Sequence, residues 1–200
     1  MQLKEGATTQ SNQDAVRKAI TRNLFELALA IYERRVLKSI AEYDSNEGVY
    51  ISGVNFILIC HKALFNDMVA HLIKVLDTNP ASATFWMIYK YEIRRVKNLS
   101  SYTEDKIFFL QKVAKRIKLI RDKTHFHIDK MAVFDPKAIW QEAAITQNEY
   151  DRALDYLWML LTELHLVVFG KGFIERAPDY YKGEDIAGFL DWARSKGLIQ

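Results

Sequence analysis

Apolar residues recur at three- and four-residue steps through most of this chain, which is the spacing of one face of an α-helix. Ile20, Leu24 and Leu27 open one such series, and Leu110, Ala114 and Ile117 lie in another. No run alternates polar and apolar residues over the length of a strand. The pattern therefore predicts an all-α chain.

Helix start and stop signals divide this pattern into segments. Pro80 ends the second segment, because proline lacks an N–H donor and disfavours helical angles in the residue before it. Asp135-Pro136 opens a short helix, with the aspartate as cap and the proline at the first helical position. The predicted helices cover about residues 14–43, 54–76, 82–97, 103–123, 136–144, 147–169 and 184–196.

Side-chain caps mark two of the predicted helix starts. Thr103 is followed by acidic residues that suit a first helical turn, and Thr146 and Glu149 have the spacing of a capping box. Gly170 relieves the left-handed strain of a helix end. Because the connections are mostly short, we expect one all-α domain over residues 1–200, a single bundle of about five long helices plus short C-terminal helices, with residues 1–12 flexible.

Composition narrows the class of protein. Of the 200 residues, 50% are hydrophobic and only 3 are proline, which argues against a disordered chain. The lone cysteine, Cys60, cannot form an internal disulfide, so a reducing compartment is expected. The first ten residues are polar, and the longest apolar runs are too interrupted to span a membrane. We expect a cytoplasmic protein without membrane contact.

Positive charge is concentrated in one part of the chain. The net charge is only +3, yet the segment from Lys106 to Lys130 holds eight basic residues against Asp122 and Asp129. Such a face can attract an RNA backbone, with binding that weakens as salt rises, or it can simply be solvated. The candidate RNA-binding residues are Lys112, Lys115, Arg116, Lys118 and Lys123.

One arginine and two histidines gather at the end of this basic helix. Arg121 is the next member of the apolar stripe formed by residues 110, 114 and 117, so it points where a core residue would. His125 lies on the same face four residues later, whereas His127 lies on another face unless the helix ends before it. An arginine forks donors toward a phosphate and a histidine transfers protons near neutral pH, which suits phosphodiester chemistry. The spacing leaves both histidines open.

The other candidate groups predict less chemistry. Asp67 and His71 are one helical turn apart and therefore share a face. They can form a buried hydrogen-bonded pair, or they can be supporting polar groups of a site. The chain has no glycine-rich phosphate loop, no Cys-x-x-Cys pair and no Glu-x-x-His motif of di-iron bundles. We therefore expect no metal site and no cofactor.

The segment Arg121-Asp-Lys-Thr-His-Phe-His-Ile-Asp129 resembles the signature of the HEPN superfamily, in which an arginine precedes a histidine by four to six intervening residues. The polar residue Asp122 after the arginine fits this signature, and Asp129 is similar to the abortive-infection (AbiU-like) branch. The resemblance implies a metal-independent endoribonuclease with Arg121 and His127 as catalytic residues and Asp122 as an orienting residue. It also implies a homodimer that brings two motifs into a shared cleft.

Two alternatives remain beside this resemblance. One is a non-catalytic helical module of the same fold that binds RNA or protein, with the motif kept as a structural element. The other is a toxin or phage-defence protein that needs a separately encoded partner, such as an antitoxin or a nucleotidyltransferase. Fold alone does not decide among them.

Overall fold

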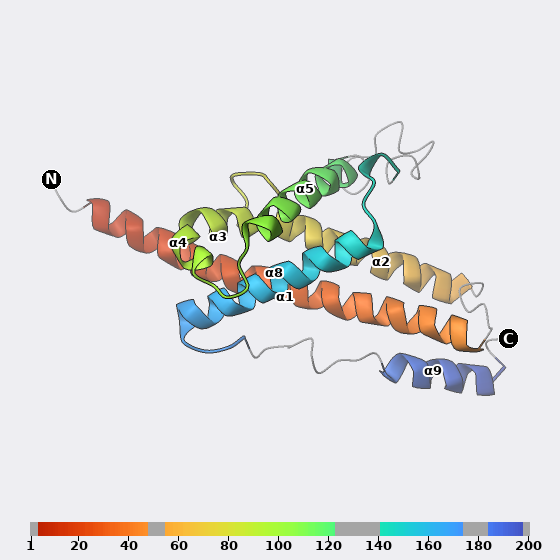
Figure 1. Cartoon of the computed structure of the whole chain (residues 1–200). Coiled ribbons are helices and arrows are strands. Elements are labelled where there is room, and N and C mark those ends of the chain that lie inside the picture. Colours follow the sequence, from red (N-terminus) through yellow and green to blue (C-terminus); the bar gives the residue numbers. More distant parts are fainter. Residues whose placement is uncertain (1–3, 48–54, 123–140, 174–183, 198–200) are drawn as a thin grey trace. The chain divides into compact units, whose positions relative to one another are not determined.

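The structure is a computed structural model that describes residues 4–47, 55–122, 141–173 and 184–197 (Figure 1). Every regular element within these ranges is a helix, and none of these residues forms a strand. The predicted all-α class is confirmed. Among the helices of these ranges, none combines the length and the apolarity needed to cross a bilayer.

The first two helices follow the apolar pattern closely at three of their four ends. Helix α1 spans Lys4–Glu47 and helix α2 spans Asn55–Leu76. Helix α1 begins at Lys4, ten residues before the predicted start at residue 14. The prediction missed these residues because residues 4–13 are mostly polar and carry no apolar stripe. The expected flexible stretch is therefore helical from Lys4.

The end of α2 is held by side-chain hydrogen bonds. Trp86 donates its indole N–H to the carbonyl oxygen of Leu76, the last residue of the helix, at 3.0 Å. Asp77 accepts the backbone N–H of Asn79 at 3.1 Å and the hydroxyl of Ser82 at 3.4 Å. These bonds satisfy groups that a helix end leaves open and fix the Asp77 carboxylate in place.

The single helix predicted over residues 82–97 is wrong. The structure has two short helices there, α3 at Phe85–Tyr91 and α4 at Ile93–Lys97. Glu92 separates them with φ −106° and ψ 19°, outside the helical region, while its N–H still donates to Ile88. Aromatic and β-branched residues fill this stretch, and their weak helix propensity lets packing decide where the helix breaks.

The predicted caps of the next two long helices are confirmed. Helix α5 spans Glu104–Ile120, and the Thr103 hydroxyl accepts the backbone N–H of Lys106 at 3.2 Å. Helix α8 spans Gln147–Phe169 and begins with the full capping box of Thr146 and Glu149. Gly170 ends it with φ 67°, in the left-handed region that glycine adopts without strain.

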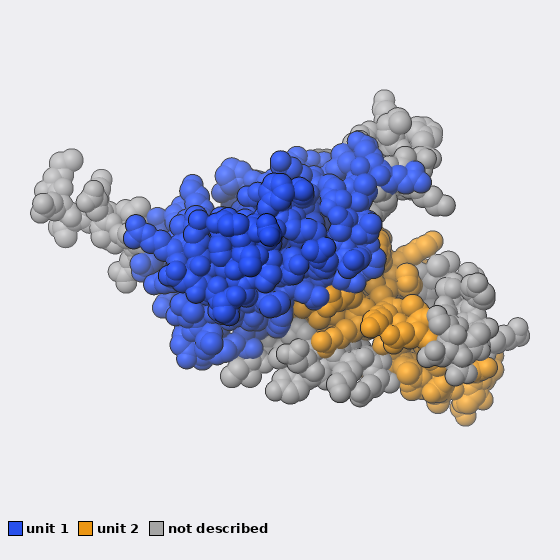
Figure 2. Space-filling view, viewed as in Figure 1, with its two compact units in different colours: residues 1–27, 72–173 blue, residues 28–71, 174–200 orange. Residues whose placement is uncertain are grey.

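The described residues fall into two compact units, coloured separately in Figure 2. Unit 1 comprises residues 1–27 and 72–173. In this unit α5 packs along α8, and α4 also contacts α8. The fully buried side chains of these two long helices include Leu110, Val113, Ile117, Leu154, Leu157 and Leu161.

Unit 2 comprises residues 28–71 and 174–200. Its helix α9, at Glu184–Ser195, matches the last predicted helix. Ile40 and Tyr43 of α1 pack with Leu190 and Ala193 of α9 in a small apolar cluster. The Tyr43 hydroxyl donates to Asp191 at 2.9 Å. This bond and the burial of the ring raise the Tyr43 pKa, burial contributing most.

Helices α1 and α2 each supply residues to both units. The prediction of one domain over residues 1–200 stays a prediction. The start of the predicted short helix, at Asp135-Pro136, lies outside the described residues.

Candidate functional site at the end of α5

The structure places part of the predicted Arg/His cluster. Arg121 directly follows α5, and Asp122 comes next in the chain. Lys123, His125, His127 and Asp129 lie outside the described residues. The predicted pairing of Arg121 with a histidine therefore stays a prediction.

Arg121 continues the buried face of α5, as the apolar stripe predicts. Leu110, Ala114 and Ile117 are at most 2% exposed, and the Arg121 side chain on the same face is 21% exposed. The Arg121 backbone N–H still donates to the carbonyl of Ile117, so the helical path carries the residue into this position. A cation here also suits the negative end of the α5 dipole.

Two carboxylates hold the Arg121 guanidinium. Its Nε and Nη2 lie 2.7 and 2.6 Å from one Asp122 oxygen, and its Nη1 donates to Asp77. No sequence signal pointed to Asp77 as a partner of Arg121, because nothing in the chain signals a contact across 44 residues. An arginine has five N–H donors, so two remain after these three contacts.

The charges around Arg121 balance. Asp122 also accepts a hydrogen bond from the ammonium group of Lys118 at 2.6 Å. The network therefore holds two cations, Arg121 and Lys118, and two anions, Asp77 and Asp122. The hydrogen bond from Lys118 is the largest cause of the lowered Asp122 pKa. Burial lowers the Arg121 pKa, but the hydrogen bonds and charges of Asp122 and Asp77 outweigh it, and the net shift is upward. The network therefore favours Arg121 and Asp122 in their charged forms.

The basic face of α5 is partly neutralised by the protein itself. Arg116 forms two hydrogen bonds to the Glu149 carboxylate, at 2.6 and 3.2 Å, and one to the carbonyl of Ala144 at 2.8 Å. This hydrogen bonding lowers the Glu149 pKa to about 2. Lys112 lies 4.3 Å from the centre of the Phe108 ring. Of the four described candidates for RNA contact, Lys112 and Lys115 have no acidic partner among the described residues.

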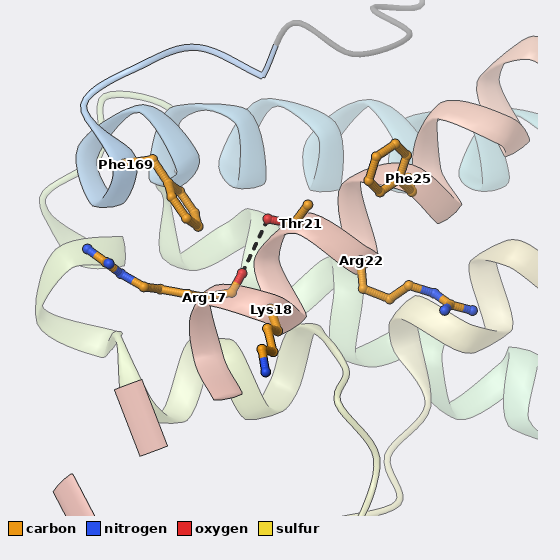
Figure 3. Close-up of a pocket in the computed structure, with 6 residues that line it drawn as sticks. All are labelled: Arg17, Lys18, Thr21, Arg22, Phe25 and Phe169. Carbon is orange, nitrogen blue, oxygen red and sulfur yellow. Dashed lines mark hydrogen bonds between the residues drawn. The ribbon is translucent and has the colours of Figure 1, made fainter. Parts of the chain in front are cut away.

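A second basic region, which sequence reasoning missed, lies on α1 and the end of α8. Arg17, Lys18, Thr21, Arg22, Phe25 and Phe169 line an open hollow of about 370 Å³ (Figure 3). The Arg17 guanidinium lies 5.4 Å from the centre of the Phe169 ring and donates to the carbonyl of Val168. Arg22 pairs with Glu26 at 2.7 Å, whereas no acid among the described residues pairs with Arg17 or Lys18.

The floor of this hollow is apolar because aromatic rings pack beneath it. Phe169 stacks on His165 with ring centres 4.3 Å apart, and Phe25 meets Phe173 edge to face at 5.3 Å. Residues on the two helices are about 150 positions apart in the chain, so no local motif announces the hollow. The basic residues line the hollow with their carbon chains, and in Figure 3 their charged ends extend outward in different directions. An apolar hollow with cations near it suits a ligand that has a flat apolar part.

Two predicted neighbours on α2 are also found together. The Nε2 atom of His71 lies 3.7 Å from the Asp67 carboxylate, and Glu33 of α1 lies 3.8 Å from the same nitrogen. The spacing of Asp67 and His71 signalled their common face, but no sequence signal pointed to Glu33.

Comparison of the chain with protein-family models, with curated proteins and with solved structures finds no match.

Proposed function

We propose that this chain is a HEPN-like, metal-independent endoribonuclease in which Arg121 contacts the scissile phosphate. The placement of Arg121 supports this proposal. The guanidinium is fixed by two carboxylates, remains 21% exposed and has two N–H donors beyond those contacts. A fixed cation costs little reorganisation when negative charge develops beside it.

In this proposal His127 takes the proton of a ribose 2′-hydroxyl. The 2′-oxygen then forms a bond to phosphorus, and the bond from phosphorus to the 5′-oxygen breaks. The leaving oxygen takes a proton from water, and the His127 imidazolium returns its proton to the resulting hydroxide, which yields a cyclic 2′,3′-phosphate and a 5′-hydroxyl. Arg121 stabilises the charge on the phosphoryl oxygens, and Asp122 orients the guanidinium.

The proposal includes a homodimer, in which two Arg/His motifs face one cleft, and a role as a toxin or phage-defence protein in the cytoplasm. An antitoxin or another protein partner would then control the activity. These parts rest on the resemblance of residues 121–129 to the HEPN signature.

Cleavage of a mixed cellular RNA pool in the presence of a chelator tests the enzyme. The purified protein should cut RNA, and Arg121→Ala and His127→Ala should each reduce cleavage at least about 100-fold, the usual scale for losing a general acid–base or charge-stabilising group. Mass spectrometry of the products should find cyclic 2′,3′-phosphate ends.

Arg95→Ala is the matched control for this assay. Arg95 is also an ion-paired arginine of unit 1, bound to Glu92 at 2.7 Å, but it belongs to α4. Its variant should cleave like the parent, with circular dichroism confirming that all variants are folded and light scattering reporting their oligomeric state. Full activity in both Arg121→Ala and His127→Ala would reject the assignment.

The same ion pairs also favour a second function, that of a non-catalytic helical module that binds RNA. If Asp77 and Asp122 consume the charge of Arg121, the arginine acts as a clamp between the end of α5 and the residue after α2. RNA would then bind elsewhere, and the hollow between Phe25 and Phe169 has the cations and aromatic rings that single-stranded RNA uses.

RNA binding without cleavage would identify this second function. Lys18→Glu should weaken the binding of a fluorescent single-stranded RNA, and the weakening should shrink at high salt, because the contact is electrostatic. Lys38→Glu, which reverses an exposed charge on the same helix, is the control. Equal affinities of these two variants would exclude the hollow as the RNA site.

A further inference from the structure

Three side chains with metal-binding chemistry converge in unit 2. Glu33 comes from α1, and Asp67 and His71 come from successive turns of α2. One ligand atom from each, two carboxylate oxygens and an imidazole nitrogen, lies within 4.8 Å of both others. Two ligands four residues apart on one helix can share an ion, as in helical zinc motifs.

The separations within this cluster exceed those of direct hydrogen bonds. The His71 Nε2 atom lies 3.7 Å from Asp67 and 3.8 Å from Glu33, whereas a charged hydrogen bond spans about 2.7–2.9 Å. Ligands about 2.0–2.1 Å from a tetrahedral ion are separated by about 3.4 Å, by simple trigonometry. A shift of a few tenths of an ångström would therefore bring each carboxylate to this separation from His71, and the two carboxylates lie within 4.8 Å of each other.

Burial gives this cluster a closed side and an open side. The side chains of His71 and Glu33 are 7% and 13% exposed, whereas that of Asp67 is 62% exposed. An ion can enter past Asp67 and meet ligands that the fold already holds in place. Three protein ligands also leave a position for water, as in zinc sites with an open coordination position.

We propose that Glu33, Asp67 and His71 form a binding site for a divalent transition-metal ion of the Zn²⁺ class. The two carboxylates balance the charge of such an ion, and neutral imidazole supplies the nitrogen that distinguishes it from Mg²⁺ or Ca²⁺. The bound ion ties α1 to α2 within unit 2. The site is independent of the proposed ribonuclease, whose assay contains a chelator.

Calorimetric titration of the full chain with ZnCl₂, after chelator treatment and desalting, tests the site. We expect one ion per chain, and Mg²⁺ should not compete. Asp67→Asn should weaken binding at least about tenfold, because even outer partners of metal ligands contribute about 10- to 100-fold. Because the Asp67 side chain is 62% exposed, this substitution should leave the fold intact, and circular dichroism checks this.

His71→Ala and the control His61→Ala complete the test. Both histidines belong to α2, but His61 is not part of the cluster. Co²⁺ provides a second measurement, since four-coordinate Co²⁺ absorbs visible light far more strongly than hydrated Co²⁺. The parent and His61→Ala should show these bands, and His71→Ala should lack them. Absence of stoichiometric Zn²⁺ binding, or equal binding by all variants, would overturn the proposal.

Discussion

Two charged clusters of this molecule use similar side chains at different spacings. Around Arg121 the nitrogen–oxygen distances to Asp122 are 2.6 and 2.7 Å, and around His71 the distances to carboxylates are 3.7 and 3.8 Å. At the shorter distances each charge already has its counter-charge. The longer distances leave room for an ion. Spacing and the chemistry of the nitrogen therefore distinguish the two clusters together, because a guanidinium group can only donate hydrogen bonds whereas a neutral imidazole can bind a metal ion.

Adding Zn²⁺ should change the free energy of unfolding through the His71 cluster and not through the Arg121 network, and this is the largest expected difference between the two. At 100 times its dissociation constant, an ion that binds only the folded state raises the free energy of unfolding by about 2.7 kcal/mol. Urea unfolding should show this gain in the parent and in Arg121→Ala, whereas Asp67→Asn, which binds at least about tenfold more weakly, should gain at most about 1.4 kcal/mol. The same gain in all three proteins would mean that Zn²⁺ acts elsewhere.

Breaking the closed network should have the next largest effect. Arg121→Ala leaves the Asp77 carboxylate, only 17% exposed, without this partner and should lower the free energy of unfolding by about 2 kcal/mol. Arg95→Ala removes an arginine that is 54% exposed and should cost under about 1 kcal/mol. In the double variant Arg121→Ala, Asp77→Asn, part of the loss should return. Additive losses would show that the two residues are not coupled.

Acid should weaken the other closed pair of α5, between Arg116 and Glu149. The Glu149 pKa falls from 4.5 to about 2 on folding, so its stabilisation is complete above pH 4.5 and is lost as the pH falls toward 2. Between about pH 6 and about pH 3 the parent should lose about 1 kcal/mol more stability than Glu149→Gln, after allowance for solvent screening. Urea unfolding at both pH values measures the difference; parallel losses would contradict it.

Lys118→Ala should show the smallest effect. The Lys118 side chain is 49% exposed, so its pair with Asp122 should contribute at most about 0.5 kcal/mol. In about 1 M salt this difference should shrink, because the Debye length falls to about 3 Å, close to the length of the pair. A loss as large as that of Arg121→Ala would mean that the network depends on Lys118 as much as on Asp77.

Local signals predicted most of the helices. Thr103, Thr146 and Gly170 mark helix ends through bonds or angles within a few residues, and the structure confirms all three. The break at Glu92 and the early start at Lys4 were missed, because packing decides the first and a polar segment hides the second. Caps and periodicity report local structure, so tertiary effects on helix ends escape them.

The candidate sites show the same division between local and distant information. The stripe of α5 predicted where Arg121 points, and the four-residue spacing predicted that Asp67 and His71 share a face. Their partners Asp77 and Glu33 come from other parts of the chain, so neither could be found without the fold. Knowing a helix face gives the direction of a side chain, but only packing gives its neighbour.

The bond from Trp86 to the last carbonyl of α2 gives this protein a built-in optical probe. Leu76, which accepts that bond, directly precedes Asp77, whose carboxylate holds Arg121. The indole is therefore bonded to the residue next to that carboxylate. Indole emission depends on hydrogen bonding and on water access. Opening of the Arg121 network should therefore change the emission of Trp86, and a Trp86→Phe difference spectrum would isolate that signal from the other tryptophans. Rapid mixing could then time the opening without any attached dye.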